Sequence, residues 1–219
     1  MEVRQELNFF GEVEGVVSSK ETSKARGEVY NGGNTLQAAI GQHDNNFTPI
    51  EMAKYISIIA NGGHDIDVTI IKGIMDQNGN RVSTEELNDF IKRRLGIDKG
   101  NKQDINFSQE NLNAILEGMR GVTSESGGTA YAYFKNFNIE VGGKTGSAQT
   151  GIEGKTNAWF VGFAPFDDPE IAVVALVENG GSGSYNAALA RDIIAEYFGM
   201  NANVVTEDMD AKPSTELQN

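Results

Sequence analysis

Residues 157–177 constrain the fold more than any other part of this 219-residue chain. Residues 157–164 and 171–177 both have strand-like composition, and the second run is apolar at every position. A strand without polar positions is typical of a strand buried on both faces of a sheet. The residues between the two runs, Pro165-Phe-Asp-Asp-Pro169, form a turn signal. We therefore expect these two strands to pair antiparallel.

A third strand is expected before them. Phe137, Ile139 and Val141 alternate with polar residues, which is the period of a strand with one buried face. The alternation leads directly into Gly142-Gly-Lys-Thr-Gly-Ser147, so this glycine-rich segment is placed on a strand.

Capping signals predict helices before these strands. Thr48 and Glu51 have the spacing of a capping box with proline at the first helical position, and the helix should stop at Asn61-Gly62-Gly63. Ser83 and Glu86 repeat the capping box and predict a helix over residues 83–95. A third apolar stripe predicts a helix over residues 108–122.

A last helix is expected after the strands. Ser184 is the predicted N-cap, and Gly199 the predicted end. The predicted core-facing stripe of this helix consists of Leu189, Ile193, Ile194 and Tyr197.

The remaining segments are less regular. Residues 1–47 are predicted to be irregular, residues 68–75 to form a short strand, and Asn78-Gly79 to form a hairpin-type turn. Residues 1–199 are expected to be one folded part, and residues 200–219 a polar, acidic and disordered tail.

Composition excludes several classes of function. The formal net charge is −13, so binding to nucleic acid through phosphate neutralisation is not expected. There is no cysteine, which excludes thiol nucleophiles and cysteine zinc sites. His43 and His64 are expected to be surface histidines in loops, and neither a metal site nor a cofactor is predicted. No run approaches the roughly 18 apolar residues of a membrane span.

The Gly142–Ser147 segment has two readings. A phosphate-binding loop requires a glycine at position 138, where this chain has Asn138, and it would be followed by a helix and not by strands. The favoured reading is an exposed strand that carries Lys-Thr-Gly. There Lys144 and the Thr145 hydroxyl can bind a carboxylate, and Gly146 lets a substrate approach the backbone. Taken alone, however, the tripeptide is more typical of a surface lysine at the end of a glycine-rich strand.

Several short motifs accompany Lys-Thr-Gly. They are residues 39–42, 48–53, 59–63, 128–130, 143–149, 158–165 and 177–181. In order and spacing these motifs resemble the C-terminal half of the transpeptidase domain of class B penicillin-binding proteins, in the penicillin-recognising, serine β-lactamase-like superfamily. The resemblance covers roughly residues 10–199.

The resemblance implies a serine acyltransferase that cross-links peptidoglycan stem peptides and is acylated by β-lactams. Lys144 and Thr145 would hold the terminal carboxylate of the stem peptide or the drug, and Gly146 would permit close approach. The Ser147 N–H would be an oxyanion-hole donor and its hydroxyl a further carboxylate contact. Relatives usually carry threonine at the position of Ser147.

Two motifs of the family are absent from this chain. No lysine has a serine three residues before it, so the Ser-x-x-Lys nucleophile motif is missing. Ser184-Tyr-Asn186 matches Ser-x-Asn in letters, but it follows Lys144, whereas the family's motif precedes the Lys-Thr-Gly strand. No catalytic nucleophile is therefore assigned, and the chain by itself is expected to be inactive.

The expected fold class is α/β (α+β), with an antiparallel sheet covered by helices. The chain would form part of a β-lactamase/transpeptidase-like fold. Lys-Thr-Gly should lie on an edge strand of this sheet. One hypothesis is that the chain is half of an enzyme: the product of a truncated gene, an expressed fragment, or one of two pieces. The alternative is a non-catalytic binding or interaction module that reuses the scaffold.

The resemblance also implies partners and a location. Peptidoglycan stem peptides and β-lactams are the expected ligands. They would bind to this chain in combination with the missing N-terminal half. A homodimer through the exposed sheet edge is a further expectation. The parent protein would act on the extracytoplasmic face of the bacterial membrane, with its anchor outside this chain.

Overall fold

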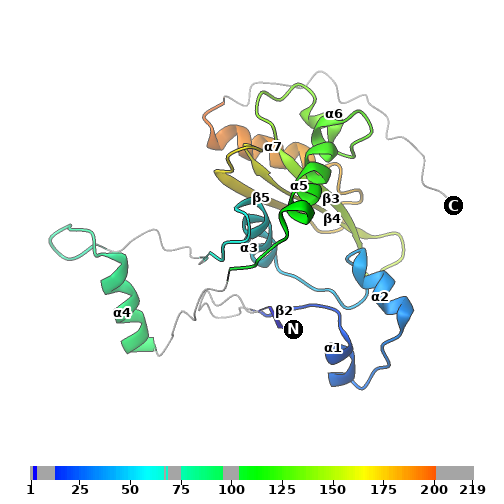
Figure 1. The fold of residues 1–219 in the computed structure, drawn as a ribbon, viewed down its shortest axis with the longest axis horizontal. Coiled ribbons are helices and arrows are strands. Elements are labelled where there is room, and N and C mark those ends of the chain that lie inside the picture. Colours follow the sequence, from blue (N-terminus) through cyan, green and yellow to red (C-terminus); the bar gives the residue numbers. More distant parts are fainter. Residues whose placement is uncertain (1, 4–12, 67, 69–74, 96–103, 201–219) are drawn as a thin grey trace.

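A three-stranded antiparallel sheet forms the centre of the computed structural model, which describes residues 2–3, 13–66, 68, 75–95 and 104–200. The strand order is β3 (Gly142–Gln149), β4 (Thr156–Ala164), β5 (Ile171–Val177). Helices lie on both sides of the sheet (Figure 1). The predicted antiparallel sheet and its covering helices are confirmed.

Two helices cover each face of the sheet. α3 (Pro49–Ala60) and α5 (Gln109–Ser124) pack against Val161 and Phe163 of β4. On the opposite face, α6 (Tyr131–Phe134) and α7 (Asn186–Tyr197) enclose Phe160, which is fully buried. The alternation of side chains along β4 therefore divides the apolar interior into two clusters.

Capping boxes start the helices where the sequence predicts them. The Thr48 hydroxyl accepts a hydrogen bond from the Glu51 N–H, and Glu51 accepts one from the Thr48 N–H at 2.7 Å. Ser83 and Glu86 form the same reciprocal pair ahead of α4 (Thr84–Leu95). Ser108 caps α5, whose extent agrees with the prediction to within two residues.

The first strand begins later than predicted. Residues 135–141 form turns and bends, and β3 starts at Gly142. The apolar residues of the predicted alternation still contribute to the core: Val141 is buried, and Phe137 and Ile139 pack against the same cluster. Carbonyl groups of this segment accept hydrogen bonds from the Thr123 hydroxyl and the Phe166 N–H, so no strand partner is required.

The expectation that β5 is buried on both faces is wrong in part. Val173 and Ala175 are buried, whereas the other residues of β5 are half-buried and Val177 is exposed. β5 is an edge strand, because among the described residues it pairs with β4 alone. Only one of its sides is therefore shielded by a neighbouring strand.

The last helix differs from the prediction in its cap and in its buried face. α7 begins at Asn186, and neither Ser184 nor Tyr185 caps it with a side-chain hydrogen bond. The Ser184 hydroxyl bonds Ser182 instead. Ile194 is buried as predicted, but Leu189, Ile193 and Tyr197 are exposed, because Ala187 and Ala190 provide the close contact with the sheet.

The segment before α3 contains regular structure that the sequence did not predict. β1 (Glu2–Val3) pairs with β2 (Gly15–Val16), and two short helices follow, α1 (Lys20–Ala25) and α2 (Gly32–Ala39). α1 and α2 are opened by Ser19 and Asn31 capping boxes. Neither shows an apolar stripe, and α2 has no buried residue, so periodicity could not reveal them.

Two further predictions fall at the margin of the described residues. The predicted strand over residues 68–75 and the tail over residues 201–219 lie almost wholly outside them. The Asn78-Gly79 turn is confirmed, with Gly79 at φ +82° and a bridge between Met75 and Arg81. Within the described ranges, no helix is both long and apolar enough to cross a membrane.

Candidate functional site

The predicted site residues lie on the open edge of the sheet. Lys144, Thr145, Gly146 and Ser147 are consecutive in β3, which pairs with β4 on one side and with no other strand among the residues described. The prediction of an edge strand is thereby confirmed. The free side of such a strand presents backbone N–H and C=O groups that an extended ligand can bind.

Lys144 and Thr145 carry the polar groups of this edge. Lys144 is exposed, and its ammonium donates to the Thr145 carbonyl at 2.5 Å. An ammonium has three donors, so this single contact leaves capacity for an anion. The Thr145 hydroxyl lies 2.7 Å from the Thr129 hydroxyl.

Thr129 is held in place by its two neighbours. Gly128 has no room for a side chain, because a Cβ there would collide with the carbonyls of α5. Ala130 is fully buried and donates its N–H to the Val122 carbonyl. The exposed Thr129 hydroxyl between them is thereby fixed against Thr145, a contact to which the sequence reading assigned no role.

Ser147 connects β3 with two distant loops. Its hydroxyl accepts a hydrogen bond from the Gly183 N–H at 3.0 Å, in the loop before α7. Its carbonyl accepts a long hydrogen bond of 3.5 Å from the Gln42 side chain. Because the N–H and C=O of one strand residue point to the same side, the Ser147 N–H is directed to the open edge as well.

The glycines around Lys144 have different surroundings. A Cβ at Gly142 or Gly143 would come within 2.5 and 2.6 Å of the rings of Phe163 and Phe160, so the core requires both glycines. A Cβ at Gly146 would meet nothing closer than the Cβ of Trp159 at 3.4 Å. Packing within the chain therefore does not demand glycine at position 146.

An ion pair and a hydrogen bond attach α5 to the start of β3. Arg120 of α5 binds both carboxylate oxygens of Glu140, at 2.7 and 3.1 Å. The hydrogen bonds and negative charge of Glu140 raise the pKa of Arg120 above its usual value. Thr123 donates to the Val141 carbonyl. These contacts set the position from which the Lys-Thr-Gly strand begins.

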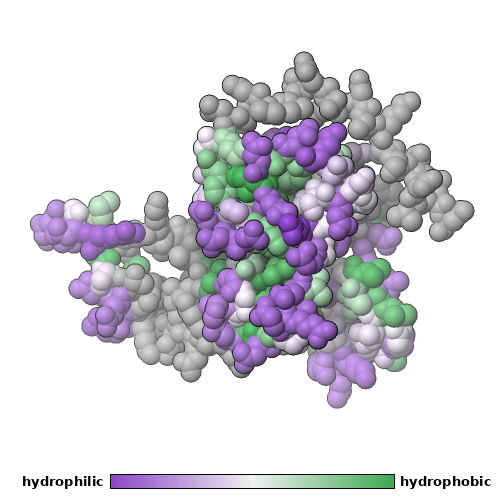
Figure 2. All heavy atoms as spheres, turned by 45° about the horizontal axis from the view of Figure 1, so that its top comes forward, coloured by the Kyte–Doolittle hydropathy of each residue, from purple (hydrophilic) through white to green (hydrophobic). Residues whose placement is uncertain are grey.

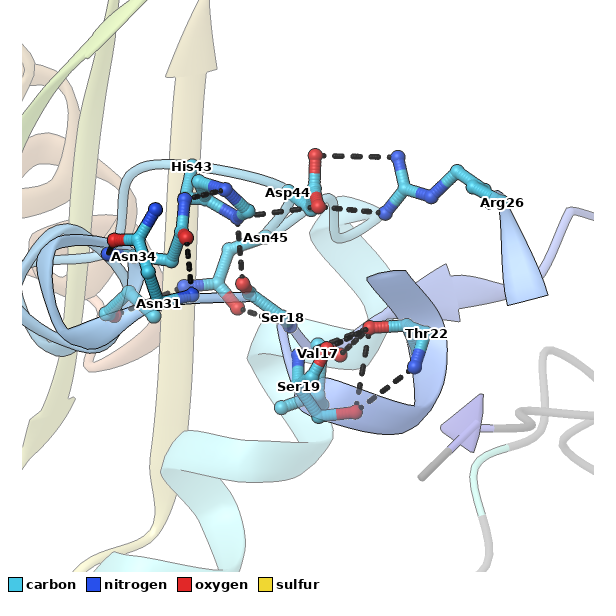
Figure 3. Close-up of polar contacts among 11 residues, drawn as sticks. Val17, Ser18, Ser19, Thr22, Arg26, Asn31, Asn34, His43, Asp44 and Asn45 are labelled. Atoms are coloured by element: carbon cyan, nitrogen blue, oxygen red, sulfur yellow. Dashed lines mark hydrogen bonds and ion pairs between the residues drawn. The ribbon is translucent and has the colours of Figure 1, made fainter. Parts of the chain in front are cut away.

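Other residues considered in the sequence lie apart from this edge. His64 and His43 are both exposed residues outside the helices and strands, as predicted, although the side chain of His43 is only 19% exposed and lies in a polar network (Figure 3). Trp159 is half-buried on β4, opposite Gly146. Asn186 is buried and donates to the carbonyls of Ala158 and Ala175, which excludes a role at the strand edge.

The groups along this edge are of kinds that can bind an anion or a carbonyl oxygen. A lysine, two threonine hydroxyls and an outward-facing N–H lie along one strand edge, and such groups bind carboxylates and oxyanions. Of the described residues, no three His, Cys, Asp or Glu side chains are grouped as metal ligands. Thr129 and Gln42 belong to short motifs visible in the sequence, but only the folded chain places them beside β3.

Comparisons with known proteins identify the family of this chain. A sequence model of the family described as penicillin binding protein transpeptidase domain matches residues 2–195. Penicillin-binding protein H of Bacillus subtilis is 36% identical over 158 residues, which cover 67% of this chain and 20% of that protein. Penicillin-binding protein 2B of Streptococcus pneumoniae is 30% identical over 175 residues, covering 77% of this chain and 25% of that protein.

A solved structure supports the same assignment. The crystal structure of Pseudomonas aeruginosa PBP2 in complex with WCK 5153 is 30% identical and superimposes with a TM-score of 0.74. The match covers 94% of this chain and 43% of that one. The chain thus spans about a fifth to a quarter of the two curated relatives named above. It belongs to the penicillin-binding protein transpeptidase family.

Proposed function

We propose that this chain supplies the substrate-binding strand of a peptidoglycan D,D-transpeptidase. Lys144 and Thr145 bind the terminal carboxylate of a stem peptide or a β-lactam, and Gly146 allows the ligand to approach the backbone. The Ser147 N–H donates to the oxyanion, and the Ser147 hydroxyl is a further carboxylate contact. The observation that carries this proposal is the open edge of β3, with these four residues in line on it.

The reaction is an acyl transfer in two steps. A serine hydroxyl attacks the carbonyl carbon of the D-Ala-D-Ala bond, its proton passes to a base, and the terminal D-alanine leaves as an amine. An amine of a neighbouring stem peptide then attacks the ester and releases the serine. Negative charge develops on the carbonyl oxygen in both steps, and an N–H fixed in a strand stabilises it without reorganising.

The nucleophile of this reaction lies outside the 219 residues, since no Ser-x-x-Lys is present. The chain therefore contributes binding and oxyanion stabilisation and requires a complementary part with the serine, its lysine and the Ser-x-Asn loop. The parent protein acts on the extracytoplasmic face of the bacterial membrane, where its stem-peptide substrate is. The rival proposal is a non-catalytic binding module. The coding sequence upstream of Met1 separates the two, because in-frame Ser-x-x-Lys and Ser-x-Asn motifs there support the enzyme.

Intact-mass spectrometry with penicillin tests the proposal. The chain alone should show no added mass, because an oxyanion donor and a carboxylate anchor cannot form an ester. A chimera in which residues 13–200 replace the matched part of Pseudomonas aeruginosa PBP2 should gain the mass of one penicillin. An adduct on a serine of the isolated chain would overturn the assignment, and a folded chimera without an adduct would favour the binding module.

A further inference from the structure

Thr145 and Ser147, the two hydroxyl residues of β3, point to the same face of the sheet. Thr145 pairs with Phe160, whose ring belongs to the cluster under α6 and α7. Residues directly opposite each other in an antiparallel pair share a face, as do residues two positions apart on one strand. Each hydroxyl is met on this face by the segment that leads into one of the two helices. Thr129 precedes α6, and Gly183 precedes α7.

The direction of the hydrogen bond at Ser147 is fixed by its partner. The Gly183 N–H lies 3.0 Å from Ser147 Oγ, and a backbone N–H can only donate. Ser147 Oγ is therefore the acceptor, and its own proton remains available for another group. The loop comes this close because residue 183 is glycine: a Cβ there would lie 2.1 Å from the Gly146 carbonyl oxygen and 2.6 Å from that of Trp159.

At Thr145 the partner is a second hydroxyl. Thr129 Oγ1 lies 2.7 Å from Thr145 Oγ1, which is an ordinary distance between two hydrogen-bonded hydroxyls. Either hydroxyl can donate when no ligand is bound. A carboxylate can only accept, so a carboxylate at Thr145 takes the Thr145 proton. The hydrogen bond between the two threonines then has one possible direction, with Thr129 as the donor.

Backbone hydrogen bonds on both sides hold Thr129 at this distance. The Gly128 N–H donates to the Glu125 carbonyl at 2.8 Å, and the Ala130 N–H donates to the Val122 carbonyl at 3.0 Å. Ala130 is fully buried, whereas Thr129 itself is exposed. The core therefore fixes the backbone around Thr129 but does not need its side chain. The contact with Thr145 is the one hydrogen bond of this hydroxyl among the described residues.

We propose that Thr129 is a positioning residue that directs the Thr145 hydroxyl proton toward the ligand carboxylate, as the Gly183 N–H does for Ser147. The inference rests on the proposed function, which places a carboxylate at Thr145 and Ser147. Each of these two hydroxyl oxygens receives a hydrogen bond from behind and donates its own proton to the ligand. Two aligned donors thus face the carboxylate.

This arrangement favours a charged ligand group over a neutral one. A hydroxyl that accepts a hydrogen bond is polarised and becomes a stronger donor. Hydrogen bonds to an ionised acceptor are about twice as strong as those between neutral groups, so a carboxylate gains most from the polarisation. Thr129 should therefore contribute to the preference of the site for a free carboxylate, although it does not touch the ligand.

Acylation rates of the chimera with Pseudomonas aeruginosa PBP2 test the proposal on two ligands. Thr129→Val removes the hydroxyl but keeps the branched shape, and penicillin acylation should slow by about five-fold, the size expected for one hydrogen bond. The methyl ester of the same penicillin, which has no carboxylate, should be slowed much less. Equal slowing of both ligands would mean that Thr129 only supports the strand, which overturns the proposal.

Two further variants at position 129 separate the hydroxyl from the shape of the side chain. Thr129→Ser keeps the hydroxyl and should acylate at nearly the original rate with both ligands. Thr129→Ala removes the hydroxyl in a smaller side chain and should reproduce the unequal slowing of Thr129→Val. Thr35→Val, at an exposed threonine of α2, is the matched control and should leave both rates unchanged. Slowing of Thr129→Ser as large as that of Thr129→Val contradicts the role of the hydroxyl.

Thr145→Val distinguishes failure of this inference from failure of the proposed function. Unchanged penicillin acylation in Thr145→Val would show that Thr145 does not bind the carboxylate, and it overturns both. If Thr145→Val slows acylation and Thr129→Val does not, the positioning role alone is wrong. In the double variant, Thr129→Val should add no further slowing, because the hydroxyl that it directs is absent. A further loss there contradicts the proposal.

Discussion

Three glycines within five residues of one another differ in what they contribute to β3. Gly142 and Gly143 allow the rings of Phe163 and Phe160 to lie against the strand backbone, and the core closes only because neither has a side chain. Gly146 faces open space apart from Trp159. At the residue scale, packing of the core therefore requires Gly142 and Gly143, whereas any requirement for Gly146 would come from the approach of a ligand.

Alanine substitutions at Gly143 and Gly146 should separate these two requirements. Gly143→Ala overpacks the core, which typically costs about 1–3 kcal/mol and lowers the melting temperature by several degrees. Gly146→Ala should leave the melting temperature of the chain nearly unchanged but slow penicillin acylation of the chimera. Calorimetry and stopped-flow acylation measure the two effects. An equal loss of stability in both variants would show that Gly146 is also a packing residue.

Lys144→Ala should strongly weaken acylation of the chimera. Loss of a charge-assisted hydrogen bond to a partly desolvated carboxylate costs about 1.5–3 kcal/mol, which corresponds to roughly a 10- to 150-fold slower rate. Lys155→Ala is the matched control, because Lys155 is an exposed lysine in the turn between β3 and β4. Equal rates for Lys144→Ala and Lys155→Ala would make Lys144 an ordinary surface residue.

At the scale of elements, one sequence motif occurs in two different environments. Glu51 is 4% exposed, and besides its cap contacts with Thr48 it accepts the Gly15 N–H at 2.7 Å. It therefore attaches the segment of β2 to α3. Glu86 makes the same cap contacts, but it is exposed on α4, which stands apart from the sheet (Figure 1). The environment decides how much each capping box contributes.

Substituting these two glutamates should give unequal losses of stability. Glu51→Ala leaves the buried N–H of Gly15 and that of Thr48 without acceptors, for a cost of about 2–4 kcal/mol. Glu86→Ala should change the free energy of unfolding of the sheet very little, because α4 can fray independently of it. Urea denaturation followed by Trp159 fluorescence measures both. A similar loss in both variants would mean that α4 unfolds together with the sheet.

At the scale of the whole molecule, apolar surface remains uncovered in several places. β5 has a free edge among the described residues, and Leu189, Ile193 and Tyr197 are exposed along α7. Leu36 and Ile40 are exposed at α2, and Figure 2 shows an apolar patch over this helix on a mainly hydrophilic face. Contiguous apolar surface and an unpaired strand are features that other chains bind.

The isolated chain should therefore self-associate through β5. Ile171–Val177 carries no lysine or proline that would block pairing with a second copy. The net charge of −13 opposes association, but salt screens this repulsion beyond about 8 Å, whereas strand pairing is a contact interaction. Light scattering coupled to gel filtration should show dimers or larger species.

A lysine at an outward position of the strand tests the route of association. Val177→Lys places a charge on an exposed position of β5 and should shift the population toward monomer. Val29→Lys, at an exposed position away from the sheet, is the control and should not. A monomer at high concentration in the unmodified chain, with cooperative melting, would refute the association.

Local signals in the sequence determined the elements that depend on neighbours in the chain. The capping boxes at Thr48 and Ser83, the Asn78-Gly79 turn and the strand over residues 171–177 are local patterns, and the structure has them where the patterns place them. The Lys144–Ser147 segment was found in the same way, because its glycines and its period are visible without a fold.

Tertiary structure alone decided which faces and which residues meet. Ala187 and Ala190 form the buried face of α7, because their small side chains permit close contact with the sheet. The helical period alone could not show that the larger apolar residues of α7 are exposed. Thr129, Gly183 and Gln42 reach β3 from segments 16 to 105 residues away. The His43 ring contacts Asn34 and Ser18, which lie in two other segments of the chain. Sequence patterns report the chain's own periodicity, whereas these contacts depend on how distant segments pack.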